Sequence, residues 1–307
     1  MSLRLHLLGA ALRPLMRFQM GRARDPYKLR RHFDGLARLA FRPVPHGYAL
    51  SQPYPAGGAD KPGLWISPGA RRRLRPVILY LHGGGYLMGS PDTHQHLVAR
   101  LCRLSGLGAY VPAYSLAPEH PLPAALDDAR AAHAYLLRLG HAPGDIILGG
   151  DSAGGGLALS LLAELCARGQ HPAAAFAWSP FCDQTFSGGS VQENDASDHF
   201  FPAARVHELR DWILGDIAAE DPRVSPLFAQ FTAPPPVLLQ VSASELLRDD
   251  SYRMAEVLRR DGGTVEVQTW ENAPHVWHML DGWIPEARAA IADTASFITR
   301  HGASAAT

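Results

Sequence analysis

The sequence has little of three things that would narrow its function at once: cysteine, charge of one sign and long apolar runs. Its three cysteines, Cys102, Cys166 and Cys182, form no Cys-x-x-Cys pair and no Cys/His ligand spacing. This pattern excludes a disulfide framework, and we expect buried free thiols and a cytoplasmic location. Basic and acidic residues number 29 each, so the overall charge favours no nucleic-acid partner.

No stretch of the sequence is long and apolar enough to span a membrane. The first twelve residues look like a weak signal peptide, but Arg13 and Arg17 interrupt the apolar run and no small-x-small cleavage site follows. Apolar residues instead recur at helical spacing, which predicts an amphipathic helix that docks on its own protein. A membrane-surface role is the alternative, since arginines lie on the polar side of this helix. The apolar residues are Leu5, Leu8, Leu12, Leu15 and Met16.

The chain is long enough, at 307 residues, for one large domain with an insertion. Apolar runs that alternate with helical segments predict a mainly parallel sheet covered on both faces, with ligands bound where the strands end. Residues 1–45 look helical, with a helix start at Asp25-Pro26, and residues 182–222 interrupt the alternation. The expected strands are 76–81, 108–114, 145–149, 173–178, 237–241 and 265–270, after weaker strands within 46–70 that turn near Gly57-Gly58. The later expected helices are 94–104, 122–139, 153–168, 203–214, 249–261 and 285–301.

A glycine-rich turn at residues 149–156, Gly-Gly-Asp-Ser-Ala-Gly-Gly-Gly, joins one predicted strand to the next helix. Ser152 lies at its centre with Gly150 and Gly154 on either side, which is the G-x-S-x-G pattern of a nucleophile elbow. Small flanking residues let strand and helix approach each other, and glycine tolerates the strained backbone of such a turn. The pattern therefore predicts Ser152 as a nucleophile at the edge of the sheet.

A serine nucleophile needs a base, and in elbow-type hydrolases the order along the chain is serine, acid, histidine. His275 and His278 both lie in the loop that follows the strand at 265–270. We favour His275 as the base, because it comes first and Pro274 stiffens the loop before it. His278 is the rival.

The acid that orients the base is expected in the loop after the strand at 237–241, where Glu245, Asp249 and Asp250 compete. Glu245 lies nearest the end of the strand, and the two leucines that follow it can pack it in place. Asp249 and Asp250 are typical of the N-cap and first turn of the next helix, which is a structural role. We therefore favour Glu245, with Asp249 as the alternative acid.

The donors for a developing oxyanion are expected in the three glycines of His82-Gly-Gly-Gly-Tyr86, directly after the strand at 76–81. Successive glycines let the backbone approach a ligand with its N–H groups turned inward. Gly84 and Gly85 are the predicted donors, together with the N–H of Ala153 beside the nucleophile. His82 is expected to anchor this loop rather than to act as a base.

These motifs together resemble those of the hormone-sensitive-lipase-like branch of the α/β-hydrolases, the bacterial family IV esterases. The resemblance spans residues 76 to about 280 in the family's order. It implies an α/β-hydrolase fold, a mainly parallel eight-stranded sheet flanked by helices, with a helical cap. It also implies Ser152 as nucleophile, His275 as base, and Gly84, Gly85 and Ala153 as oxyanion donors. The matching stretches are His82-Gly-Gly-Gly-Tyr86, Tyr114-Ser-Leu-Ala-Pro-Glu-His-Pro121, Gly150-Asp-Ser-Ala-Gly-Gly155, Ser179-Pro-Phe-Cys-Asp183, the loop from Glu245 to Asp249, and Pro274-His275.

One position departs from the family's pattern, which has Asp-Pro-Leu-x-Asp in the acid loop with the first Asp catalytic. Here the loop reads Glu245-Leu-Leu-Arg-Asp249, and a glutamate can do the same work with an adjustment of one methylene. The resemblance also implies a cap built from residues 1–45 and 182–222. Residues 46–181 and 223–307 then form the catalytic domain.

The residues predict a serine carboxylic-ester hydrolase, whose partner is a small-molecule ester. A two-part cap that closes over the pocket limits the acyl chain, so short-to-medium acyl esters are expected. A lactonase or amidase with the same triad, and a non-catalytic binder of hydrolase fold, are the alternatives. No metal or cofactor is expected, because His94-x-His96 and His275-x-x-His278 have no nearby carboxylate or cysteine ligands. The sequence leaves the oligomeric state open and allows a homodimer.

Overall fold

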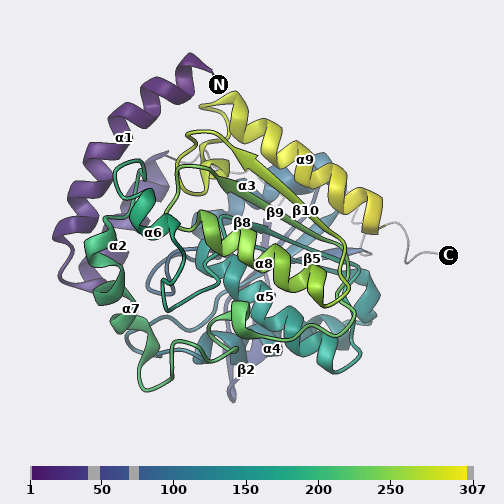
Figure 1. The fold of residues 1–307 in the computed structure, drawn as a ribbon. Helices are drawn as coiled ribbons and strands as arrows, with labels where there is room; N and C mark the ends of the chain where they lie inside the picture. Colours follow the sequence, from purple (N-terminus) through teal and green to yellow (C-terminus); the bar gives the residue numbers. More distant parts are fainter. Residues whose placement is uncertain (1, 41–48, 69–75, 303–307) are drawn as a thin grey trace.

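The computed structural model describes residues 2–40, 49–68 and 76–302. Its centre is an eight-stranded sheet in the order β1-β4-β6-β5-β7-β8-β9-β10 (Figure 1). The six strands β6, β5, β7, β8, β9 and β10 run parallel to one another. At one edge of the sheet, β4 pairs antiparallel with β6, and β1 pairs antiparallel with β4. The predicted mainly parallel sheet is thus confirmed. The strands are β1 (Ala49–Ser51), β4 (Gly63–Ile66), β6 (Gly108–Pro112), β5 (Val77–Leu81), β7 (Ile146–Asp151), β8 (Ala174–Trp178), β9 (Val237–Ser242) and β10 (Val265–Trp270).

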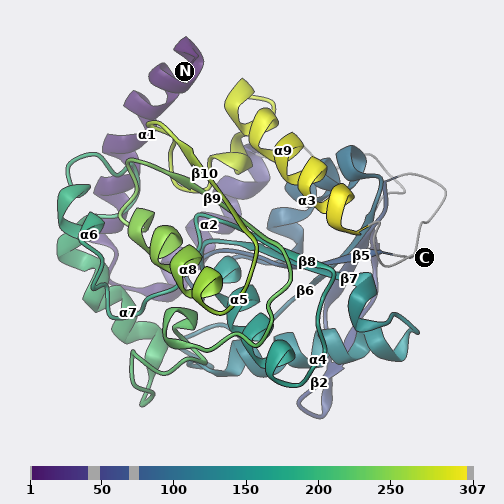
Figure 2. The same ribbon diagram turned by 45° about the vertical axis from the view of Figure 1, so that its right-hand side comes forward.

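Helices cover both faces of the sheet, as Figure 2 shows. On one face, α3 (Pro91–Ser105) packs against α9 (Pro285–Gly302). On the other face, α4 (Ala124–Arg138), α5 (Ser152–Ala167) and α8 (Arg248–Arg260) share a second apolar core. The strands β6, β5, β7, β8 and β9 are buried at every position under these helices, so the ends of the strands are the part left for a ligand.

The central strand β5 shows why its sequence is apolar throughout. Ile78 and Tyr80 point into the core beneath α3 and α9. Val77, Leu79 and Leu81 point the other way, into the core beneath α4 and α5. Successive side chains of a strand alternate between its faces, so a strand covered on both sides needs apolar residues at every position.

Local capping explains where two of the helices begin. The α3 helix starts at Pro91, three residues before the predicted start, because Ser90 and Thr93 form a capping box in which each side-chain oxygen accepts the other residue's backbone N–H. The α2 helix (Pro26–Ala40) starts where expected, and the Asp25 carboxylate accepts the N–H groups of Tyr27 and Lys28. The predicted turn near Gly57-Gly58 joins the short strands β2 (Tyr54–Ala56) and β3 (Ala59–Lys61).

The first helix, α1 (Leu3–Arg22), docks on the protein as the sequence predicts, with Leu5 and Met20 buried. The prediction is wrong for Leu15, which is 50 % exposed. Leu15 precedes Met16 by one position, which turns its side chain about 100° around the helix axis and away from the docking face. Across the described ranges, no helix has the length and apolarity needed to cross a bilayer.

The two segments expected to form the cap meet through α1, whose C-terminal half lies beside the segment that carries α6 (Ser190–Glu193) and α7 (Val206–Leu214) (Figures 1 and 2), whereas α2 contacts α3. The predicted helix at 203–214 starts with a 3₁₀ turn at Ala203–Arg205. Arg17 of α1 donates to the Asp195 carboxylate at 2.9 Å, and Arg205 donates to the carbonyl of Gly21 at 2.7 Å. The boundary near residue 45 lies outside the described residues, and the division into cap and catalytic domain stays a prediction.

Candidate active site

Ser152 lies at the apex of the turn between β7 and α5. Its φ of +51° falls in the left-handed region, which serine rarely adopts. A Cβ at Gly150 would overlap the carbonyl of Gly154, and a Cβ at Gly154 would overlap the carbonyl oxygens of Leu81 and His82. The close packing of α5 against the end of β5 therefore requires both glycines and holds Ser152 in its strained conformation.

The structure brings Ser152, His275 and Glu245 into one chain of hydrogen bonds. The Nε2 atom of His275 lies 2.8 Å from Ser152 Oγ, and its Nδ1 atom lies 2.6 Å from Glu245 Oε2. The three residues follow β7, β10 and β9, whose carboxyl ends meet at one edge of the sheet. An ionised carboxylate only accepts hydrogen bonds, so the proton of neutral His275 belongs on Nδ1 and Nε2 is left to accept the proton of Ser152.

The second carboxylate oxygen of Glu245 is fixed by two donors. The Ser179 hydroxyl donates to Glu245 Oε1 at 2.7 Å, and the backbone N–H of Ser242 donates to the same oxygen at 2.9 Å. Ser179 Oγ also accepts the N–H of Val276 at 3.3 Å, directly after His275. The hydroxyl of Ser179 thereby joins the end of β8 to both the acid loop and the histidine loop.

The electrostatics of the site favour a positive charge on His275. Burial by itself lowers the pKa of His275, but the carboxylate of Glu245 opposes burial through its charge and its hydrogen bond. The charges of Asp198 and Asp151 act in the same direction. The pKa of His275 is raised above its ordinary value of 6.5 as the net result, which makes the imidazole a stronger base toward the serine hydroxyl.

The alternative acid, Asp249, binds elsewhere. Its Oδ2 atom accepts the N–H of Ser190 at 2.9 Å, and its Oδ1 atom accepts the guanidinium of Arg248 at 2.9 Å. These contacts hold the start of α8 against α6. Of the two carboxylates that the sequence left open, the structure places Glu245 on His275 and Asp249 on the insertion.

The N-cap role predicted for Asp249 is wrong, because the N-cap of α8 is Leu247, whereas the predicted first-turn position is confirmed, since both aspartates lie in the first turn of α8. The Asp250 carboxylate is buried and accepts the N–H groups of Cys182 and Asp183 at 2.7 and 3.0 Å. Burial raises the pKa of Asp250 to about 8. Both aspartates therefore bind backbone N–H groups of the chain between residues 182 and 190 rather than those of their own helix.

The rival histidine, His278, lies in the core behind the site. Its Nε2 atom is 2.8 Å from Gln240 Oε1, and its ring stacks on Trp178 with 4.4 Å between the centroids. Burial lowers the pKa of His278 to about 3. The structure thus places His275 rather than His278 within reach of Ser152.

The glycine loop after β5 is anchored to the elbow by Asp151, which the sequence analysis overlooked although it lies inside the quoted motif. Asp151 Oδ1 accepts the N–H of Gly83 at 3.0 Å and the hydroxyl of Tyr80 at 2.6 Å. Its Oδ2 atom lies 3.5 Å from Nε2 of His94. Because Asp151 directly precedes Ser152, these contacts hold the glycine loop beside Ser152.

The predicted oxyanion donors lie in this loop and at the start of α5. Gly84 and Gly85 have φ values of +122° and +61°, which favour glycine, and the Gly84 carbonyl accepts the N–H groups of Leu87 and Met88. Ala153 belongs to the first turn of α5, where N–H groups have no carbonyl partner within the helix.

His82 anchors the start of the glycine loop, as the sequence predicts. Its Nδ1 atom lies 2.9 Å from the Gly83 carbonyl, and its ring stacks on Tyr114. The Tyr114 hydroxyl donates to the His82 carbonyl at 2.6 Å. Burial lowers the pKa of His82 to about 3. Among the residues with described positions, no group of three or more histidine, cysteine or acidic side chains could hold a metal ion.

A loop from the insertion covers His275. The rings of Phe200 and Phe201 face the His275 ring edge-on, with centroids 6.1 and 5.4 Å away. Asp198 is buried, and its carboxylate accepts the N–H groups of both phenylalanines and of Leu246, at 2.7, 2.8 and 2.8 Å. Asp198 was not among the predicted residues, although an acid two positions before a Phe-Phe pair inside the insertion is a recognisable signal.

The chain is similar to known ester hydrolases over most of its length. A family model described as alpha/beta hydrolase fold matches residues 78–279. An acetyl-hydrolase of Streptomyces hygroscopicus is 37 % identical over 235 residues, which are 76 % of this chain and 78 % of that protein. An esterase of Acinetobacter venetianus is 35 % identical over 75 % of this chain and 77 % of its own length.

Solved structures of esterases superpose on nearly the whole chain. EstE5, solved after a soak in ethyl alcohol, has a TM-score of 0.89 at 31 % identity and covers 99 % of this chain and 100 % of its own. An esterase from the bacterial hormone-sensitive lipase family has a TM-score of 0.87 at 32 % identity, over 98 % of this chain and 99 % of its own. Fold and site together define an α/β-hydrolase. Within that class, the chain belongs to the hormone-sensitive-lipase-like, bacterial family IV branch, and it is a carboxylesterase.

Proposed function

We propose that this carboxylesterase hydrolyses short-to-medium acyl esters with Ser152 as nucleophile, His275 as general base and Glu245 as the residue that orients His275. The observation that carries the proposal is the pair of contacts on the imidazole, 2.8 Å to Ser152 Oγ and 2.6 Å to Glu245 Oε2. The same arrangement of hydroxyl, imidazole and carboxylate serves acyl transfer on several unrelated folds.

In the acylation step, Ser152 Oγ attacks the carbonyl carbon of the ester while His275 Nε2 takes the serine proton. The charge that develops on the carbonyl oxygen is stabilised by the N–H groups of Gly84, Gly85 and Ala153. Collapse of the tetrahedral intermediate breaks the bond to the alcohol oxygen. The alcohol leaves with the proton from His275, and the acyl group stays on Ser152.

Deacylation repeats these steps with water in place of the serine. His275 takes a proton from the water as the oxygen attacks the acyl carbon. The second tetrahedral intermediate releases the carboxylic acid and returns the proton to Ser152 Oγ. Glu245 keeps the Nδ1 proton of His275 in place throughout and stabilises the imidazolium that forms twice in each cycle.

The substrate range is proposed from the segments beside the site. Residues 1–45 and 182–222 form the cap, and residues 46–181 and 223–307 form the catalytic domain. Phe200 and Phe201 from the second cap segment face His275, so apolar rings border the place where a substrate reacts. A border of this kind favours small acyl groups over long chains.

The test is a pair of serine variants on one helix, assayed with a chromogenic short-chain ester. We expect Ser152→Ala to lower kcat on the order of 10⁵-fold, because the nucleophile is lost. Ser160→Ala is the matched control, since Ser160 is buried on α5 and its hydroxyl has no hydrogen-bond partner among the described residues. Unchanged turnover by Ser152→Ala would contradict the proposal.

A substrate panel separates the related activities. Acyl esters of increasing chain length, lactones and aryl amides are compared by kcat/KM, and we expect the short acyl esters to give the highest values. A higher value for lactones or amides would replace the esterase assignment with the corresponding activity. Tight binding of an ester without turnover by the unmodified protein would point to a binding protein.

The cellular location proposed for this esterase is the cytoplasm. Its three cysteines, Cys102, Cys166 and Cys182, are free and buried, an arrangement that suits a reducing compartment. Burial also raises the pKa of Cys166 to about 11, so this thiol is protonated and unreactive at neutral pH. The partner proposed is a small-molecule ester, and the homodimer that the sequence allows stays a prediction.

A further inference from the structure

The α1 helix presents a second apolar stripe on the face opposite its docking side. Leu3, Leu7, Leu15 and Phe18 are 73, 61, 50 and 56 % exposed. Leu3, Leu7 and Phe18 recur at helical spacing, so they lie along one side of the helix. Leu5 and Met20, in contrast, are buried against the protein. A helix that buries only one of two apolar faces leaves the other available to a partner.

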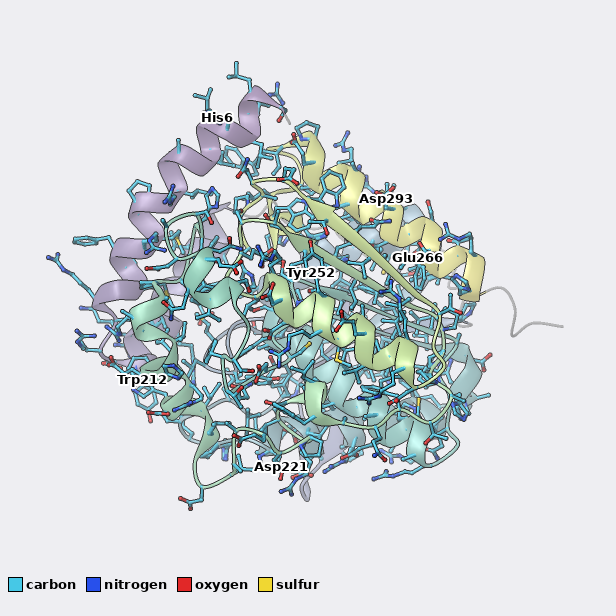
Figure 3. The ribbon with its side chains drawn as sticks, viewed as in Figure 1. His6, Trp212, Asp221, Tyr252, Glu266 and Asp293 are labelled. Atoms are coloured by element: carbon cyan, nitrogen blue, oxygen red, sulfur yellow. The ribbon has the colours of Figure 1, made fainter. Side chains whose placement is uncertain are left out.

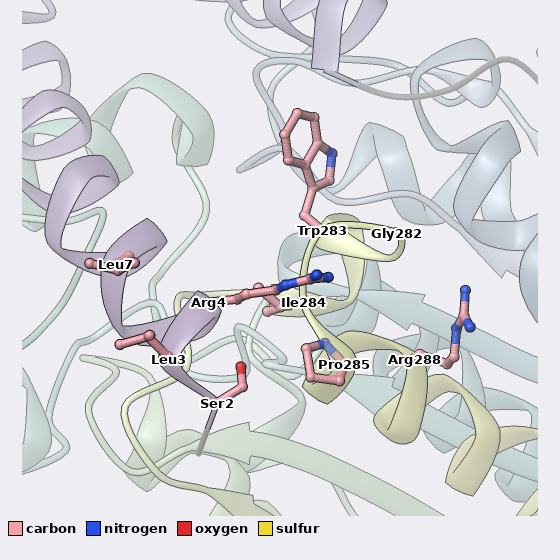
Figure 4. Close-up of a pocket in the computed structure, with 9 residues that line it drawn as sticks. All are labelled: Ser2, Leu3, Arg4, Leu7, Gly282, Trp283, Ile284, Pro285 and Arg288. Carbon is pink, nitrogen blue, oxygen red and sulfur yellow. The ribbon is translucent and has the colours of Figure 1, made fainter.

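The stripe continues onto the turn before α9. Leu3 and Leu7 line a pocket of about 490 Å³ together with Trp283 and Ile284 (Figure 4). Trp283 is 54 % exposed, and tryptophan with one wet and one apolar side is enriched at membrane surfaces. The exposed apolar surface thus combines two leucines and an indole at one end of α1 with a phenylalanine near the other.

Positive charge borders this stripe. The sequence from residue 2 to residue 24 contains five arginines and no aspartate or glutamate. Arg4 and Arg22 are exposed on one side of the stripe, and the Arg22 guanidinium lies over the Phe18 ring at 4.1 Å from its centroid. His6 is exposed on the other side and projects from the helix in Figure 3. Arg288 adds a basic side chain to the rim of the pocket.

Two carboxylates beside the pocket are turned inward. Glu286 is 9 % exposed and accepts the backbone N–H and the hydroxyl of Ser2. The Asp281 side chain is 14 % exposed and pairs with Arg100 at 3.2 Å and with the exposed Arg288 at 3.7 Å. The charged side chains of α1 itself are all basic, although the whole chain is neutral.

We propose that the outer face of α1, with Leu3, Leu7 and Phe18 and with Trp283 beside them, docks on an anionic lipid surface. An apolar stripe with arginines along its edges lies in the plane of a membrane interface, where the apolar side chains enter the headgroup region and the arginines bind anionic headgroups. A second copy of this chain fits less well, because a two-fold contact through this face would oppose the same arginines.

The docking surface is connected to the candidate active site. Arg17 of α1 donates to the carbonyl of Phe201 at 3.0 Å and to the carboxylate of Asp195 at 2.9 Å. Phe201 in turn faces His275. A lipid surface bound to α1 would therefore lie on the cap side of the molecule, where esters dissolved in the lipid can reach the site.

The test is co-sedimentation of the full chain with vesicles, and it does not depend on turnover. Vesicles of phosphatidylcholine alone are compared with vesicles that contain about one third phosphatidylglycerol. We expect the protein to pellet with the anionic vesicles only, and to be released when the salt is raised from about 0.05 M to about 0.5 M. Performing the assay with Ser152→Ala protein as well excludes any effect of lipid hydrolysis.

The decisive variant is Leu7→Glu/Phe18→Glu, for which we expect at least a tenfold weaker partition to anionic vesicles, and unchanged turnover of a soluble ester. Leu104→Glu/Leu139→Glu is the matched control, since those leucines are 40 and 47 % exposed on other helices, and it should bind as the unmodified chain does. Equal partition of the two double variants would overturn the proposal. So would a dimer in solution that Leu7→Glu/Phe18→Glu dissociates, because the face would then belong to a second copy.

Discussion

The edge of the sheet that carries Ser152, His275 and Glu245 is built differently from the loop at 195–201 that covers it. At the sheet edge, Ser152, Glu245 and His275 lie in the segments that follow β7, β9 and β10, and the register of the parallel pairs aligns the ends of these strands. The loop lies in a segment with little regular structure and is held by polar contacts with α1 and with the acid loop. We therefore expect changes at the sheet edge to stop the chemistry, and changes in the loop to alter binding and pH dependence.

After Ser152→Ala, the comparison of Glu245 with Asp249 gives the largest expected effect. Glu245→Gln keeps the size of the side chain but replaces an acceptor on Nδ1 of His275, so the favoured imidazole tautomer is lost. We expect kcat to fall about 10⁴-fold. Asp249→Asn changes a carboxylate that binds Ser190 and Arg248 instead, and we expect kcat to change by less than about threefold.

Steady-state kinetics on one soluble ester measures both variants, and circular dichroism checks that each is folded. A loss of activity in Asp249→Asn as large as in Glu245→Gln would show that the acid loop rearranges and that Asp249 takes part in the reaction. Equal activity of Glu245→Gln and the unmodified chain would remove Glu245 from the proposed mechanism.

Sequence alone predicted the sheet, the order of its helices and the residues that the structure brings together at its edge. This was feasible because Ser152, Glu245 and His275 each lie within a few residues of an apolar run, so a local pattern placed them. The start of α3 was misplaced, because the capping box of Ser90 and Thr93 extends the helix beyond its apolar pattern.

The supporting contacts escaped prediction because they join distant parts of the chain. Asp198 binds the N–H of Leu246, 48 positions away, and Arg17 binds Asp195, 178 positions away. Ser179 lies at a strand end, but a serine there carries no sign that its hydroxyl will bind Glu245. Such contacts follow from how the insertion and α1 fold over the sheet, which no local spacing encodes.

The Arg17→Met variant tests the covering loop, and its expected effect on the kinetics is smaller than that of Glu245→Gln. Its guanidinium donates to Phe201, to Asp195 and, at a longer distance, to Asp198. We expect Arg17→Met to loosen the loop and raise KM about three- to tenfold, while kcat changes by less than about threefold, because the contacts of His275 with Ser152 and Glu245 remain. The free energy of unfolding should fall by about 1–2 kcal/mol, since Arg17 is only partly buried.

The matched control for Arg17→Met is Arg24→Met. The Arg24 side chain is 67 % exposed and lies 3.7 Å from Glu208, so its loss should leave KM and stability nearly unchanged. Kinetics on a soluble ester and urea unfolding measure both variants. A fall in kcat of Arg17→Met with an unchanged KM would mean that α1 supports the chemistry rather than the covering loop.

The smallest expected effect concerns pH and Asp198. The groups that act on the charge of His275 are Glu245, Asp198 and Asp151, and all three raise its pKa. In the proposed mechanism the neutral imidazole is the base, so kcat/KM should rise with pH through a midpoint above the ordinary 6.5 of histidine. Burial raises the pKa of Asp198 above its ordinary value, whereas the three N–H groups that its two oxygens accept act against burial and favour the charged form.

Removing the charge of Asp198 makes the imidazolium less favourable, so the pKa of His275 falls and the base becomes neutral at lower pH. We therefore expect Asp198→Asn to move the midpoint of kcat/KM down by about half a pH unit, and Asp195→Asn, whose carboxylate binds Arg17 instead, to leave it in place. An Asp198→Asn variant that lowers kcat/KM equally at every pH would show that Asp198 only shapes the loop. A shifted midpoint would show that the loop also acts on the charge of His275. The covering loop would then help to set the pKa of the imidazole that the sheet edge holds in position.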